Sequence, residues 1–176
     1  MADSLSDLFL SLLDFSPVSR IRRNHGLEHA TLHVLAERNP RRTMAGHSDL
    51  NGFWIIGDIT TEEITAAVRE ALGRLQNGEH SLAVHPNCGT NFATAGILAG
   101  GMASLAMLGG QNKRDRLERI PLAVSLATLG IIIAQPLGLL VQRQVTTAGN
   151  PEALQVIEIA PSQRGRFKAH RIVTAG

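Results

Sequence analysis

Apolar residues are concentrated in two long runs in the second half of the chain. Residues 92–110 and 120–141 contain no Asp, Glu, Lys, Arg or His. Each run approaches the roughly 20 apolar residues that span a bilayer. We therefore predict a two-helix transmembrane hairpin over residues 92–141, with the lipid bilayer as its partner. Two buried core helices are the alternative, but the rest of a 176-residue chain offers little structure to cover them.

The first run is rich in glycine and alanine. Gly96 and Gly100 form a G-x-x-x-G pair, which lets the backbones of two membrane helices approach closely. The pair predicts packing of the first span against the second. The Gly96/Gly100 face could also join two copies of the chain in an oligomer.

The charges around the runs give conflicting predictions of orientation. The connecting loop, residues 111–119, carries four basic residues against two acidic ones, and the positive-inside rule would place this loop in the cytoplasm. However, residues 1–91 show no secretory signal and would have to cross the membrane whole. The single cysteine also suits a reducing compartment. We therefore expect an integral membrane protein with a cytoplasmic soluble domain.

The polar first half predicts a small α/β unit. Ser16-Pro17 is a start signal with Ser16 as the N-cap, and Asn39-Pro40 is a stop signal, which together predict a helix of about 20 residues. The apolar residues 52–57, bracketed by glycines, are typical of a buried strand.

A second helix and a second strand are predicted after this strand. Thr60 and Glu63 have the spacing of a capping box, and helical periodicity continues to Asn77-Gly78. Residues 81–85 then read as a strand. The order strand, helix, strand predicts a right-handed parallel crossover.

Three segments complete the predicted architecture. Residues 5–15 are apolar with two aspartates, which favours an interfacial or docking helix. Residues 154–159 and 167–173 are predicted strands around a turn. The expected fold class is thus α/β: a soluble domain over residues 1–91, the hairpin over 92–141, and a short C-terminal β segment, 142–176, that packs on the soluble domain.

The predicted first helix carries a face of histidines. His25, His29 and His33 are four residues apart, so neighbouring Cβ atoms lie about 5–6 Å apart on one face. His25-x-x-Glu28-His29 is the H-x-x-E-H pattern of inverted zinc peptidases, in which the histidines bind zinc and the glutamate activates water. Histidines that only face solvent or the core are the alternative. His33 extends the face and could support or replace a ligand.

A second candidate cluster precedes the first apolar run. His85 and Cys88 have the two-residue separation common in metal sites, within a turn that contains Pro86 and Gly89. A cysteine that is simply a small buried residue is the alternative. Taken together, the two clusters predict a zinc (Zn²⁺) site with four candidate ligands, His25, His29, His85 and Cys88, and Glu28 as the catalytic base.

The two motifs resemble those of a known family. H-G-x-E-H at residues 25–29 and H-P-x-C-G-T at residues 85–90 are followed by hydrophobic spans, Gln142 and Thr146-Thr147. In this order they are similar to the YqhQ-like bacterial membrane proteins, a family named for a domain of unknown function. The segment between the motifs looks longer here, so the chain is closer to a shorter relative. The resemblance implies a bacterial or plastid membrane protein with a metal site and no established activity.

Three functions follow from these observations. The first is a metal-dependent, peptidase-like hydrolase acting on a peptide or membrane protein. The second is a membrane scaffold or assembly factor in which four ligands close a structural zinc site. The third is a thiol enzyme with Cys88 as the nucleophile, although its turn lacks a recognised nucleophile elbow. A nucleic-acid partner is not expected, because 17 Lys and Arg against 15 Asp and Glu give too small a basic excess.

Overall fold

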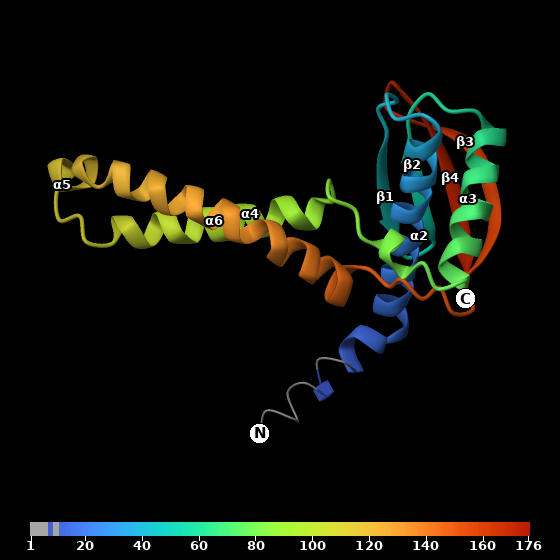
Figure 1. Cartoon of the computed structure of the whole chain (residues 1–176), viewed down its shortest axis with the longest axis horizontal. Coiled ribbons are helices and arrows are strands. Elements are labelled where there is room, and N and C mark those ends of the chain that lie inside the picture. Colours follow the sequence, from blue (N-terminus) through green and yellow to red (C-terminus); the bar gives the residue numbers. More distant parts are fainter. Residues whose placement is uncertain (1–6, 9–10) are drawn as a thin grey trace. The chain divides into compact units, whose positions relative to one another are not determined.

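The computed structural model describes residues 7–8 and 11–176, which form two compact units (Figure 1). Unit 1 is Met1–His85 with Arg143–Gly176, and unit 2 is Pro86–Gln142. The elements of the chain are, in order, α2 (Ser16–Arg38), β1 (Ala45–Asp49), β2 (Gly52–Ile56), α3 (Thr61–Gln76), the 3-10 helix η1 (His80–Ala83), α4 (Gly89–Met107), α5 (Lys113–Glu118), α6 (Ile120–Val141), the π-helix η2 (Gln142–Thr146), β3 (Gln155–Arg164) and β4 (Phe167–Ala175).

Unit 1 is built on a four-stranded antiparallel sheet with the order β1-β2-β4-β3. Helices α2 and α3 lie side by side on one face of this sheet (Figure 1). The alternation of β2 turns Phe53 and Ile55 into the core, where they meet Leu27 of α2 and Ile64 of α3. Trp54 lies on the opposite face, where the guanidinium groups of two arginines of the C-terminal strands stack over its ring. The fold is therefore a mixed helix and sheet layer structure.

Several predicted elements are confirmed. Helix α2 has Pro17 in its first turn and ends at Arg38, before Pro40. Its N-cap position is Phe15, without a side-chain cap bond, so the prediction of Ser16 as the cap is wrong by one residue. The capping box of α3 is present: the Glu63 amide donates to Thr60 Oγ1 at 3.2 Å, and the Thr60 amide donates to Glu63 Oε2 at 3.0 Å.

The parallel crossover is wrong. Residues 81–85 are not a strand, because residues 80–83 wind into η1, in which the Leu82 amide donates to the Glu79 carbonyl at 3.1 Å. The predicted strand over residues 52–57 is β2, and its antiparallel partner is β1, which precedes it in the chain. The sequence of β1, Ala-Gly-His-Ser-Asp, has no apolar alternation and so carries no signal of a strand.

The predicted C-terminal strands are confirmed as β3 and β4. Strand β3 continues through Pro161, where a turn was expected, and the chain reverses at Gly165 with φ of 61°. Proline is tolerated there because β3 is at the edge of the sheet. Of the predicted N-terminal helix, residues 7–8 and 11–14 are helical, whereas residues 5, 6, 9 and 10 lie outside the described part of the chain.

One described helix, Ile120–Thr146, is long and apolar enough to cross a membrane. Helix α4 is not such a candidate, since glycines and the polar Thr90 and Asn91 interrupt its apolar sequence. Among the described residues the structure therefore has one candidate membrane-spanning helix, and the predicted transmembrane hairpin of two is not shown. Within unit 2, α4 and α6 nevertheless run side by side (Figure 1).

The close approach of α4 and α6 depends on glycines of α6. A Cβ atom on Gly130 would lie 2.9 Å from backbone atoms of Leu98 and Ala99. A Cβ atom on Gly96 or Gly100 would meet nothing described within 4 Å. The prediction that these two α4 glycines pack against the second apolar helix is therefore wrong.

Substituting Gly130 by valine should loosen the α4–α6 pair. Overpacking of this kind costs about 1–3 kcal/mol, so the free energy of unfolding of the detergent-purified chain should fall by that order. Gly96→Val is the matched control, because it adds the same side chain to an open position of the partner helix. Thermal unfolding followed by circular dichroism measures both, and equal melting temperatures would contradict the packing.

Candidate metal centre

Four histidine rings of unit 1 lie together, three of them on helix α2 and the fourth in the segment after η1. The rings of His25 and His29 are edge to face, with centroids 4.3 Å apart. The ring of His85 lies 5.6 Å from that of His29 and 4.9 Å from that of His33. The four-residue spacing along α2 thus places three imidazoles on one face, and the segment after η1 adds a fourth.

Backbone carbonyl groups orient the three helix histidines. His25 Nδ1 donates to the Thr146 carbonyl at 2.9 Å, and His29 Nδ1 donates to the Ala83 carbonyl at 2.8 Å. A carbonyl oxygen can only accept, so Nδ1 carries the proton and Nε2 carries the ring lone pair. His33 is held the other way, with Nε2 donating to the Val84 carbonyl at 3.0 Å. This fixing of tautomer and ring direction is typical of histidines that bind metals.

Two imidazole nitrogens and one thiol are the candidate ligands. The ligand atoms of His25 and His29 lie within 4.8 Å of each other, and zinc–nitrogen bonds are about 2.0–2.1 Å, so small ring rotations bring both nitrogens onto one ion. His25, His29 and Cys88 are a group that could hold a metal ion. Cys88 follows His85 by three residues, so chain length alone keeps their Cα atoms within about 11 Å.

Cys88 is buried and also begins helix α4. Its Sγ accepts a hydrogen bond from the Thr90 amide at 3.4 Å, as the N-cap of that helix. The positive end of the helix dipole favours a negatively charged thiolate, and the thiolate is the form of cysteine that binds metals.

The other predicted site residues are Glu28 and His85, and only the ring of His85 lies beside a member of the group, His29. Glu28 is 4% exposed. Its carboxylate fits against β1, where a Cβ atom on Gly46 would lie 2.1 Å from Glu28 Oε1. Burial, and then the like charge of His33, lower the pKa of the half-buried His85. A lowered pKa keeps its imidazole neutral, the form that can bind a metal.

Gly26, inside the H-G-x-E-H motif, is a structural residue whose role is not evident from the sequence. A Cβ atom here would lie 2.2 Å from the Ala148 carbonyl oxygen, and the Ala148 amide donates to the Arg22 carbonyl at 2.9 Å. The segment that supplies the Thr146 carbonyl to His25 therefore lies directly on α2. Only glycine leaves room for it.

Comparison with known proteins shows the family of the chain. The sequence model of DUF6391, a domain of unknown function, matches residues 20–159, a range that includes the histidines, Glu28 and Cys88. The chain belongs to the DUF6391 family. An uncharacterised protein of Picosynechococcus sp. (strain ATCC 27264 / PCC 7002 / PR-6) is 35% identical to this DUF6391 chain over 152 residues, which are 79% of the chain and 73% of that protein. No solved structure matches the chain.

These findings confirm a domain of unknown function, as the motif resemblance implied. They confirm neither the YqhQ-like family nor its motifs. Because neither match carries a known function, the function of this DUF6391 chain is proposed below from the geometry of the centre.

Proposed function

We propose that this DUF6391 protein is an integral membrane, zinc-dependent hydrolase of peptides or membrane proteins. The observation that carries the proposal is the pair of imidazoles on α2, each with Nδ1 bound to a backbone carbonyl, within a His25, His29 and Cys88 group that could hold a metal ion. A backbone carbonyl that accepts from one ring nitrogen is the usual partner of a histidine whose other nitrogen binds a metal.

The donor set fits zinc. Imidazole and thiolate together suit zinc better than the hard cations magnesium and calcium. Three protein ligands, His25, His29 and Cys88, leave a fourth position for water, as in catalytic zinc sites. When bound there, zinc would lower the pKa of that water towards 7 and polarise a substrate carbonyl.

Glu28 is the proposed general base. It lies between the two histidine ligands in sequence, and β1 holds its buried side chain against Gly46. In this role its carboxylate takes a proton from the attacking water and later returns it to the leaving amine. The peptide substrate class follows from the H-x-x-E-H spacing of residues 25–29, which is that of inverted zinc peptidases. His85 is proposed to support the ligands from its place beside His29.

Membrane insertion is proposed from α6 and its extension. Only 17% of the apolar window of Ile120–Thr146 is buried, whereas a core helix of a soluble protein would bury most of such a window. Large apolar side chains, such as Ile131, Ile132 and Leu140, are exposed along this helix. We further propose that α4 enters the bilayer with α6 and that unit 1 lies in the cytoplasm, because the thiol of Cys88, three residues after His85 of unit 1, suits a reducing compartment.

Glu28→Gln tests the hydrolase directly. The full chain, purified in detergent and loaded with zinc, is incubated with β-casein, and new amino termini are counted. The variant should keep its zinc, measured by mass spectrometry, while the rate falls by about 10²- to 10⁴-fold, the usual contribution of a general base.

Glu37→Gln is the matched control, since Glu37 lies on the same helix with its side chain 54% exposed. This variant should hydrolyse casein at the wild-type rate. Equal rates for Glu28→Gln and Glu37→Gln would overturn the role of Glu28. A zinc-loaded wild type that releases no new termini, together with loss of zinc and of folding in Cys88→Ser, would favour the structural zinc of a scaffold instead.

A further inference from the structure

We propose that strand β1 is the docking edge for the substrate, which joins the sheet as an added strand in an extended conformation. This inference rests on the proposed hydrolase, because it states how a peptide would reach Glu28. Strand β1 lies at one edge of the sheet, and β2 is its only strand partner in the described part of the chain (Figure 1). The other side of such a strand presents backbone N–H and C=O groups that an extended peptide can bind.

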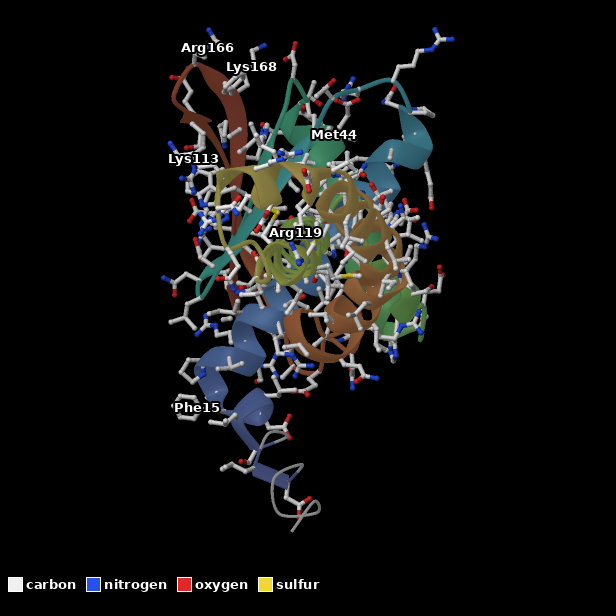
Figure 2. The ribbon with its side chains drawn as sticks, turned by 90° about the vertical axis from the view of Figure 1, so that its left-hand side faces the viewer. Phe15, Met44, Lys113, Arg119, Arg166 and Lys168 are labelled. Carbon is white, nitrogen blue, oxygen red and sulfur yellow. The ribbon has the colours of Figure 1, made fainter. Side chains whose placement is uncertain are left out.

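The opposite edge of the sheet is protected against pairing. Strand β3 contains Pro161, which has no backbone N–H to donate, and its register with β4 shifts between Val156 and Glu158. Charged side chains project where β3 and β4 join, as those of Arg166 and Lys168 do in Figure 2. Proline, bulges and charges are the devices by which natural sheets prevent an edge strand from pairing with another chain.

Strand β1 has neither a proline nor a bulge. Its five residues, Ala45–Asp49, pair with Gly52–Ile56 in unbroken register. Its acidic side chain, Asp49, is engaged by Arg171 of β4, which donates to both carboxylate oxygens at 2.8 Å. The other side chains of β1 are small apart from that of His47, so they leave space for the backbone of another chain. Strand β1 is therefore the edge that is open to pairing.

The proposed general base lies on this strand. Helix α2 packs on β1, and a Cβ atom on Gly46 would lie 2.1 Å from Glu28 Oε1 and 2.6 Å from Glu28 Cδ, so the carboxylate rests on the backbone of β1. Neighbouring strands are about 4.8 Å apart, which would place the backbone of a peptide paired with Gly46 about 6 Å from this carboxylate. One attacking water fills that distance between a general base and a peptide carbonyl.

Docking by backbone pairing also defines the substrate class. His25 is three residues before Glu28 on α2, so their Cβ atoms are about 5–6 Å apart, and a peptide along β1 meets a proposed zinc ligand and the proposed base at one point of its chain. The backbone groups of an extended or unfolded protein segment can pair with β1, whereas those of a helix are already bonded to each other. The substrate is therefore an extended segment, recognised by its backbone.

Peptides with single N-methyl groups test the docking without requiring cleavage. Overlapping fluorescein-labelled peptides cover β-casein, and fluorescence anisotropy selects the tightest binder to the zinc-free full chain in detergent. This peptide is then N-methylated at one residue at a time. Alternate residues of a strand bond to the same neighbour, so the Kd should rise about twofold to tenfold at every second residue, the value of one hydrogen bond, and stay unchanged between them.

Photo-crosslinking identifies the edge that the peptide occupies. A benzophenone group on the same peptide should form adducts within residues 44–50, which mass spectrometry of the digested chain locates. Strand β3 is the matched control, because it is the other edge of the same sheet. Adducts mainly within Gln155–Arg164, an N-methyl effect without the two-residue period, or the absence of any binding peptide would each overturn the docking edge.

Cleavage of the same peptides by the zinc-loaded chain separates this inference from the proposed function. Periodic binding with adducts on β1, but without cleavage, would overturn the hydrolase and leave β1 as a docking edge for extended peptides. Cleavage without the two-residue period would overturn the docking edge and leave the hydrolase in place. Periodic binding, adducts on β1 and cleavage together are the expected result.

Discussion

The double variant His25→Ala/His29→Ala is expected to purify without metal, whereas the wild type should carry about one zinc per chain. Two of the three proposed ligands are removed, and the remaining Cys88 thiolate cannot hold zinc alone, since stable protein sites use three or four protein ligands. Loss of even one group that supports a ligand weakens metal affinity about 10- to 100-fold, so loss of two ligands should bring zinc to background. Mass spectrometry of the purified chain measures the metal content.

Two further variants make this result specific. His47→Ala/His80→Ala removes the same number of imidazoles from exposed positions and should keep its zinc. His25→Asn/His29→Asn keeps a side-chain amide donor for the Thr146 and Ala83 carbonyls while removing both Nε2 atoms. It should therefore stay folded and still lose zinc. Full zinc content in this folded variant would place any metal elsewhere and remove the basis of the proposed function.

The features that could be predicted from the sequence are those that depend on residues close together in the chain. The four-residue spacing of His25, His29 and His33 required only a helix to place them on one face, and Pro17 and Pro40 marked where that helix begins and ends. The capping box at Thr60 and Glu63 likewise depends on residues three positions apart. Each of these patterns is contained within a few turns of chain.

The parts that could not be predicted depend on backbone atoms and distant segments. The carbonyls of Ala83 and Thr146 fix the tautomers of the ligands, and any residue type can supply a carbonyl. Strand β1 pairs through its backbone with β2, so its polar sequence carried no strand signal. The glycines of α4 suggested a packing face, but an apolar run does not indicate which of its small residues meets a partner, and Gly130 of α6 does so instead.

Gly26→Ala is expected to destabilise unit 1 by at least about 2 kcal/mol, at the severe end of single substitutions. The added Cβ atom would lie 2.2 Å from the Ala148 carbonyl oxygen, and a backbone atom cannot move aside as the end of a flexible side chain can. Relief requires the segment of Thr146 and Ala148 to move away from α2. This movement should break the bond from His25 Nδ1 to the Thr146 carbonyl and weaken zinc binding, because a ligand that loses its orienting partner typically binds about 10- to 100-fold less tightly.

Gly73→Ala, in the same unit, is expected to raise the free energy of unfolding instead of lowering it. Gly73 lies in α3, where a Cβ atom would meet nothing described within 4 Å, so alanine should stabilise the helix by about 0.5–1 kcal/mol. The two variants make the same chemical change in two helices and differ in what the new methyl group meets. Thermal unfolding compares them, and titration with zinc compares their affinities. Equal melting temperatures and equal zinc affinities would mean that the Ala148 segment moves at little cost, and that its contact with α2 does not orient His25.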